Sequence, residues 1–157
     1  MYEEPKIKVP RFHEDSGFYT TQKRSRMMSR IRSKNSKPEL ILRKALWKEN
    51  IRFRINSKLV PGRPDIAIQK YQLAIFVDGE FWHGYHWPEK KKTLKANRAF
   101  WIPKIERNMQ RDREVNRQLQ EMGFTVFRFW VHEIKTNLNR CVQDILTHIE
   151  TFPHRYD

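Results

Sequence analysis

Two short apolar runs, two residues apart and bounded by carboxylates, constrain the fold of this chain more than any other feature. Residues 66–69 and 72–77 are rich in aliphatic side chains, and Lys70-Tyr71 joins them as a short turn. Asp65 precedes the first run and Asp78 follows the second. Antiparallel pairing places the start of one strand beside the end of the next, so we expect both carboxylates at one edge of a sheet.

Helical and strand periodicity elsewhere in the chain predicts four helices and two further strands. Ser36, Pro38 and Glu39 mark the start of the second helix, because they fit an N-cap, a first-turn proline and a capping box. The apolar residues from Leu40 to Trp47 then form its expected buried stripe. Gly123 is the expected end of the longest helix. The expected helices cover 22–33, 36–47, 98–121 and 142–149, the strands cover 51–56 and 124–130, and 81–97 is expected to be a long loop.

The order of these elements predicts an α/β fold with a central mixed sheet and helices on both faces. The helix between the third and fourth strands permits a parallel crossover. At 157 residues the chain has room for one core, and we expect a single domain over residues 21–157. Residues 1–20 contain two prolines and a glycine and show no helical or strand period. They are expected to form a flexible arm.

The charge of the chain indicates its partner. Lysine and arginine outnumber aspartate and glutamate by 32 to 18, which gives a net charge of +14, so nucleic acid is the expected partner. The single cysteine, Cys141, excludes an internal disulfide and a multi-cysteine zinc site. No apolar run approaches the length of a membrane span. We expect a monomeric, cytoplasmic protein.

The carboxylates around the apolar runs have the composition of a cation site. Asp65, Asp78 and Glu80 would repel one another unless a proton or a cation lay between them, and Mg²⁺ binds to such groups while keeping water and phosphate oxygens. His83 follows, and an imidazole is suited to take a proton from water. The structural alternative is that the aspartates cap turns and His83 lies on the surface. For any one of these residues alone the structural alternative is favoured, whereas the presence of all of them together favours a catalytic site.

Four motifs occur in order along the chain: Pro61-Gly62-Arg63-Pro64-Asp65, Phe81-Trp82-His83, Phe100-Trp101, and Asn108 with Arg111-Asp112-Arg113. Together they resemble the very-short-patch repair (Vsr) endonucleases, over about Thr21 to Ile149. The resemblance implies a restriction-endonuclease-like, three-layer α/β/α fold of the PD-(D/E)XK superfamily. It also implies an enzyme that uses Mg²⁺ to nick double-stranded DNA 5′ to the thymine of a T:G mismatch.

The resemblance also implies roles for individual residues. Asp65 matches the principal metal-binding carboxylate, Val77 stands where the family offers a backbone carbonyl to the metal, and His83 matches the catalytic histidine. Glu39 matches an acidic residue near the site. Its capping-box role is at least as well supported by spacing, and the two roles would compete for one carboxylate.

Aromatic and basic side chains indicate how DNA would be bound. By the resemblance, Phe81, Trp82 and Trp101 wedge into the duplex, where unstacking costs least at imperfect pairs. Core packing is the alternative for Trp101, and it is the expected role of Trp47. Phosphate contacts are expected from basic residues of the first helix and of the long loop, unless these are only solvated: Arg24, Arg26, Arg30, Lys90, Lys91 and Lys92.

This chain departs from the family pattern at two places. Where the family holds a structural zinc, the chain has Glu80, Tyr85, Trp87 and His132, so no structural zinc is expected. Asp78 replaces a second histidine of the family's active site, and Glu80 follows it, which makes the expected metal site richer in carboxylates. The same change leaves mismatch specificity open.

Taken together, these patterns predict a Mg²⁺-dependent DNA endonuclease. Its expected metal ligands are Asp65, Val77, Asp78 and Glu80, and His83 activates water. One alternative is a restriction or phage-defence nuclease of the same fold without mismatch specificity. A second, from another class, is a basic DNA-binding module without catalysis.

Overall fold

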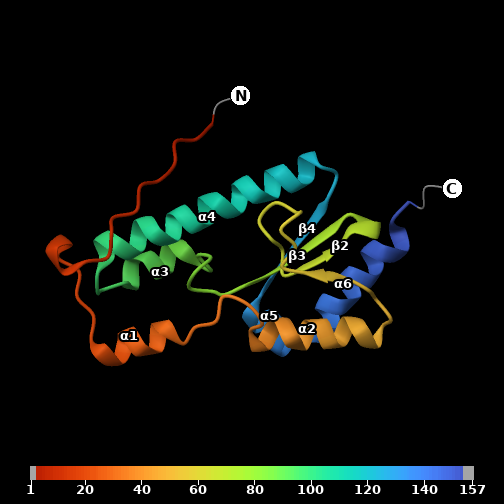
Figure 1. The fold of residues 1–157 in the computed structure, drawn as a ribbon, viewed down its shortest axis with the longest axis horizontal. Coiled ribbons are helices and arrows are strands. Elements are labelled where there is room, and N and C mark those ends of the chain that lie inside the picture. The colour runs from red at the N-terminus through yellow and green to blue at the C-terminus, as the bar shows by residue number, and fades with distance from the viewer. Residues whose placement is uncertain (1–2, 154–157) are drawn as a thin grey trace. The chain divides into compact units, whose positions relative to one another are not determined.

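A computed structural model describes residues 3–153. The chain forms two compact units. The aromatic unit comprises Met1–Arg32 and Gly79–Glu114, and the sheet unit comprises Ser33–Asp78 and Val115–Asp157. The elements in chain order (Figure 1) are η1 (Glu14–Ser16), α1 (Gln22–Ser29), α2 (Lys37–Lys48), β1 (Arg54–Ile55), β2 (Ile66–Ile68), η2 (Gln69–Tyr71), β3 (Leu73–Asp78), α3 (Trp87–Thr93), α4 (Arg98–Glu121), β4 (Thr125–Trp130), α5 (Val131–Thr136) and α6 (Leu138–Thr151).

The sheet unit is built on a mixed sheet with the strand order β1-β2-β3-β4. Strands β2 and β3 pair antiparallel with Ile66 opposite Ile75, and η2 forms the turn between them. Strands β3 and β4 pair in parallel, with Asp78 opposite Trp130. The predicted hairpin is confirmed, and the β3–β4 pairing is the parallel arrangement that the sequence permitted.

Alternation along the strands gives this sheet two apolar faces. One face packs Ile66 and Ile75 against Leu42 of α2 in a core that also includes α5 and α6. The other face packs Phe76 against Leu119 of α4. Each fully buried aliphatic side chain stabilises the fold by roughly 1.5–3 kcal/mol. Helices therefore cover both faces of the sheet, and the predicted three-layer α/β/α fold is confirmed (Figure 1).

The turn before Asp65 depends on Gly62. Its φ of 76° lies in the left-handed region, which residues with a Cβ rarely adopt. An added Cβ would also overlap Cγ1 of Val115. Glycine is therefore needed at this position for the chain to enter β2 with Asp65 directly before the strand.

In the aromatic unit, the region expected to be a loop contains a helix. Residues 81–97 include α3, so this part of the prediction was wrong. Two turns precede the helix, in which His83 N–H donates to the Gly79 carbonyl and Tyr85 N–H donates to that of Glu80, at 3.1 and 2.9 Å. Trp87 is the only buried residue of α3. A short basic helix with one buried residue carries no period that a sequence could reveal.

The N-terminal segment is tied to α4 by Gln110, which is 1% exposed. Its side-chain amide donates to the Pro5 carbonyl at 3.0 Å and accepts from Ile7 N–H at 3.0 Å. One side chain thus satisfies two backbone groups of an extended segment. The flexibility expected of residues 1–20 stays a prediction.

Several helix and strand predictions need correction. Trp47 is 71% exposed and Leu40 is 50% exposed, so the buried stripe of α2 is narrower than expected. Met122 also lies on the surface. The helix α1 ends at Ser29, β1 has only two residues, and the short α5 was not predicted. Among the described residues, no helix has both the length and the apolar character needed to cross a membrane.

Candidate active site

Asp65 is held at the start of β2 by the neighbouring strand. The backbone N–H of Val77 donates to its Oδ2 at 2.6 Å. Burial raises the pKa of Asp65 to about 7, the Val77 hydrogen bond lowers it in part, and the charges of Glu39 and Asp78 raise it further. The antiparallel register therefore brings the two predicted aspartates into one electrostatic environment, as the hairpin predicted.

Glu39 caps α2 and also lies against Asp65. Its Oε2 accepts from the backbone N–H of Ser36 at 3.2 Å, which completes the capping box of α2. The same carboxylate pairs with Arg43 at 3.4 Å and is hydrogen-bonded to Asp65. The helix cap therefore fixes an acidic side chain against Asp65.

The chemistry of this donor set fits a divalent cation. Asp65 is half-buried, lies against a second carboxyl group, and forms no ion pair with any residue of the described range 3–153. Such a carboxyl retains a proton near neutral pH unless a cation replaces that proton. Oxygen donors of this kind suit a hard ion such as Mg²⁺.

Asp78 closes β3 and is 4% exposed. Its two carboxylate oxygens accept from Nη1 of Arg128 at 3.3 and 3.1 Å. Arg128 comes from β4, where it lies opposite Phe76 in the parallel register. The predicted metal ligand Asp78 is thus part of a buried ion pair within the sheet unit.

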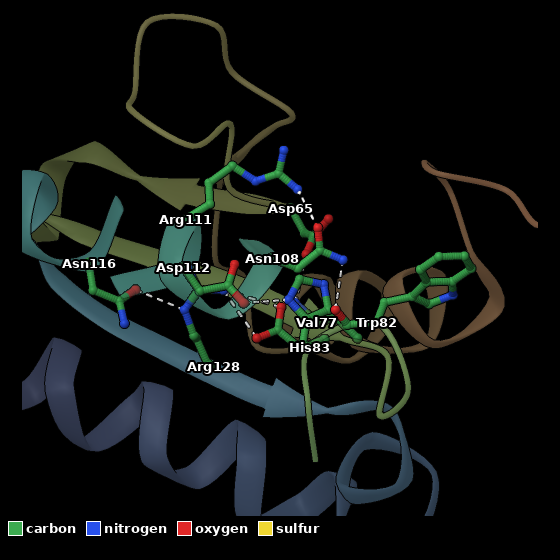
Figure 2. Close-up of polar contacts among 10 residues, drawn as sticks. Asp65, Val77, Trp82, His83, Asn108, Arg111, Asp112, Asn116 and Arg128 are labelled. Atoms are coloured by element: carbon green, nitrogen blue, oxygen red, sulfur yellow. Dashed lines mark hydrogen bonds and ion pairs between the residues drawn. The ribbon is translucent and has the colours of Figure 1, made fainter. Parts of the chain in front are cut away.

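In the aromatic unit, His83 forms a hydrogen-bonded pair with Asp112 of α4. Nδ1 of His83 lies 2.6 Å from Oδ2 of Asp112, and Figure 2 shows the two side chains pointing toward one another. A carboxylate at Nδ1 holds the proton on that nitrogen, so the neutral ring carries its basic lone pair on Nε2. This is the tautomer that a general base needs.

The aromatic residues that the sequence singled out form one cluster. The ring centroids of Phe81, Trp82 and Trp101 lie 5.3–5.7 Å apart, with edge-to-face packing. Asn108 donates to the Trp82 carbonyl at 3.0 Å and accepts from Arg111 at 3.2 Å (Figure 2). The position of the Trp82 backbone is therefore fixed by a buried amide of α4.

A groove of about 240 Å³ opens beside this cluster within the aromatic unit. Phe81 and Trp101 line it together with Arg24, Met27 and Met28 of α1. Its walls therefore combine aromatic rings, flexible thioethers and a cationic side chain.

The remaining predicted phosphate contacts differ in their surroundings. Arg26, Arg30, Lys90 and Lys92 are exposed. Lys91 pairs instead with Glu106 at 2.6 Å, and this contact lowers the pKa of Glu106. The indole N–H of Trp87 donates to the same carboxylate at 3.2 Å. Glu80 is half-buried and lies in the turn at the start of the second segment of the aromatic unit, Gly79–Glu114.

Sequence reasoning assigned no role to three polar residues that organise these sites. Asp112 and Asn108 were noticed only as parts of a motif, although their spacing of four places both on one face of a helix. Arg128 gave no local signal, because its partner Asp78 lies on a strand fifty residues away in the chain.

Comparison with known proteins places these features in context. Residues 16–89 match the family model described as DNA mismatch endonuclease Vsr. The type II nicking enzyme V.NmeDIP of Neisseria meningitidis serogroup C is 45% identical over 126 residues, covering 80% of this chain and 85% of that protein. V.HpaIIP of Haemophilus parainfluenzae, also a type II nicking enzyme, is 44% identical over 74% of this chain and 82% of its own length. The DNA mismatch endonuclease Vsr of Escherichia coli (strain K12) is 36% identical over 68% of each chain.

Proposed function

The chain belongs to the Vsr family of DNA mismatch endonucleases and is a DNA endonuclease, and we propose on this basis that it makes a Mg²⁺-dependent nick 5′ to the thymine of a T:G mismatch. One observation carries the metal dependence: the half-buried Asp65 carboxyl, which lies beside Glu39 and forms no ion pair among residues 3–153. We also propose that the enzyme works as a monomer in the cytoplasm without a structural zinc.

Asp65 is proposed as the principal ligand of the cation, with the Val77 carbonyl beside it in sequence as a second oxygen donor. A divalent cation bound there would polarise a phosphoryl oxygen and lower the pKa of a bound water. Glu39 would keep the Asp65 carboxyl in place through their hydrogen bond. The ligand role expected of Glu80 stays a prediction.

His83 is proposed as the general base. Because Asp112 holds the proton on Nδ1, Nε2 would take a proton from the attacking water. Asp112 then stabilises the imidazolium that forms, without itself receiving the proton. In-line attack of water on the phosphorus would break the bond to the 3′ oxygen and leave a 5′-phosphate and a 3′-hydroxyl.

Phe81, Trp82 and Trp101 are proposed to bind the duplex at the mismatch. Their edge-to-face cluster presents rigid apolar surface, and inserting such a wedge costs least where two bases are already poorly paired. The exposed arginines of α1 and the exposed lysines of α3 would contact phosphates, which adds affinity without sequence information.

A second candidate is a nick in fully paired duplex. It is favoured by the names of V.NmeDIP and V.HpaIIP, which describe nicking enzymes and mention no mismatch. Incubation with Mg²⁺ of matched and T:G-mismatched duplexes with identical flanks, resolved on a denaturing gel, separates the two. Equal nicking of both duplexes would reject the mismatch assignment.

The catalytic assignment is tested in the same assay with Asp65→Asn. Nicking should fall by at least about 100-fold while affinity for the duplex is kept, because the substitution removes a ligand and preserves the shape of the side chain. Asp144→Asn, on the exposed face of α6, is the matched control and should nick normally. Full activity of Asp65→Asn would refute the metal assignment.

A further inference from the structure

Arg128 occupies an unusual place for a charged side chain. It comes from the parallel strand next to β3, and its guanidinium carbon lies 4.0 Å above the ring of Phe76. From there Nη1 reaches both oxygens of Asp78, at 3.3 and 3.1 Å. The side chain therefore lies along β3 toward the acidic end of that strand.

The guanidinium is also fixed from the opposite side. Nε of Arg128 donates to Oδ1 of Asn116, from α4, at 2.8 Å (Figure 2). Stacking on Phe76 and this hydrogen bond leave the guanidinium little freedom to turn. An arginine stays protonated at every physiological pH, so Asp78 has a permanent cationic partner.

Arginines are distributed unevenly among the acidic side chains of the sheet unit at this edge. Glu39 pairs with Arg43 and Asp78 pairs with Arg128, and both carboxylates are almost fully buried. Asp65 feels the charges of both carboxylates and forms no ion pair among residues 3–153. The protein thus supplies an arginine to Glu39 and to Asp78 and none to Asp65.

We infer that Arg128 is a positioning residue, which acts as the resident counter-ion of Asp78 and keeps that carboxylate out of the inner coordination shell of the cation at Asp65. A buried carboxylate that already accepts from a guanidinium cannot coordinate a second cation without bringing two positive charges together. Asp78 then acts at a distance, as a fixed negative charge. The inference rests on the proposed metal-dependent nicking and revises the ligand role that the sequence predicted for Asp78.

The decisive comparison is between two isosteric variants, Asp65→Asn and Asp78→Asn. Binding of Mn²⁺ is followed by electron paramagnetic resonance, with the protein alone and with a nicked duplex bound. Asp65→Asn should weaken Mn²⁺ binding by more than about 100-fold, whereas Asp78→Asn should weaken it by no more than about 10-fold, because only an outer charge is lost. Equal losses in the two variants would overturn the inference.

Arg128→Met provides a readout that a purely structural role would not produce. Methionine retains contact with Phe76 but leaves Asp78 without its counter-ion. The variant should bind additional Mn²⁺, and Asp78→Asn combined with Arg128→Met should lose that gain. Arg128→Lys, which keeps a positive charge beside Asp78, should bind no additional Mn²⁺. An Arg128→Met variant that stays folded and binds no additional Mn²⁺ would contradict the inference.

If circular dichroism shows that Arg128→Met does not fold, the comparison of Mn²⁺ binding by Asp65→Asn and Asp78→Asn still tests the inference. Failure of the proposed function looks different from failure of this inference. In the first case Asp65→Asn would bind Mn²⁺ and nick DNA normally. In the second case Asp65→Asn would be inactive, and Asp78→Asn would lose Mn²⁺ binding to the same extent.

Discussion

The two units of this protein are held together in different ways. The sheet unit buries aliphatic side chains on both faces of a mixed sheet. The aromatic unit, in its described residues, contains no strand and depends on side chains that bond to backbone groups, such as Gln110 and Asn108, and on aromatic edges. Apolar burial is non-directional and can force a carboxyl group out of water, as at Asp65. Directional bonds are suited to orienting individual groups, such as His83.

The largest expected effect tests the apolar side of this comparison. Leu42 is fully buried in the core of the sheet unit, so Leu42→Ala should lower the free energy of unfolding by roughly 2–5 kcal/mol, measured by urea denaturation. Leu40→Ala, in the same helix at a half-exposed position, is the matched control and should cost less than about 1 kcal/mol. Similar losses in both variants would mean that α2 is not anchored through this core.

The next effect concerns orientation in the aromatic unit. Asp112→Asn should reduce the rate of nicking by about 100-fold, or about 2.7 kcal/mol of activation free energy, because His83 loses the acceptor that sets its tautomer. DNA affinity and thermal stability should change little. The loss of rate is measured by single-turnover nicking across a range of pH. Asp15→Asn, at an exposed site of the same unit, is the control. An unchanged rate would remove Asp112 from the mechanism.

The pKa of Asp65 gives the sheet unit a characteristic dependence on pH. Burial raises the pKa from 3.8 to about 7 in the folded protein, so the folded state binds a proton more tightly than the unfolded state. The resulting stability is fully present below pH 3.8 and is lost as pH rises toward 7. In EDTA, Asp65→Asn should remove a pH-dependent contribution on the order of 1–3 kcal/mol. This contribution is measured by thermal denaturation of the unmodified protein and of Asp65→Asn between pH 4 and pH 8. If the stability of the two proteins depended on pH in the same way, the assignment of the raised pKa to Asp65 would be contradicted.

The smallest expected effect is local to the aromatic unit. Gln110→Ala removes the hydrogen bonds to Pro5 and Ile7 and should raise hydrogen exchange of the N-terminal segment, by the loss of roughly 1–2 kcal/mol of local stability. Gln118→Ala, on the exposed surface of the same helix, should leave that exchange unchanged. Equal exchange in both variants would show that the segment is held by other contacts.

Sequence reasoning succeeded where structure follows from a local period. The β2–β3 hairpin and the full extent of α4 followed from apolar patterns and turn residues, and β4 has the parallel pairing that the preceding helix permitted. It failed for α3 and α5, which are too short to show a period. The exposure of Trp47 was also missed, because a helical stripe does not reveal how wide the contact with the sheet will be.

Prediction of the candidate site had a similar limit. The hairpin alone placed Asp65 and Asp78 at one edge of the sheet, since register is a consequence of the turn. The partners of Asp78 and His83, which are Arg128 and Asp112, come from elements far along the chain. Only the assembled structure brings such pairs together.

The interruption of the sheet unit by residues 79–114 has a consequence for synthesis on the ribosome. Strand β3 is complete at Asp78, but its parallel partner β4 ends only at Trp130. At an elongation rate of about 5–20 residues per second, the nascent hairpin waits roughly 3–10 s with one apolar strand edge uncovered. During that interval the growing polypeptide is exposed to misassociation and to chaperones, and Asp65 and Asp78 are already synthesised before the sheet that encloses them is complete.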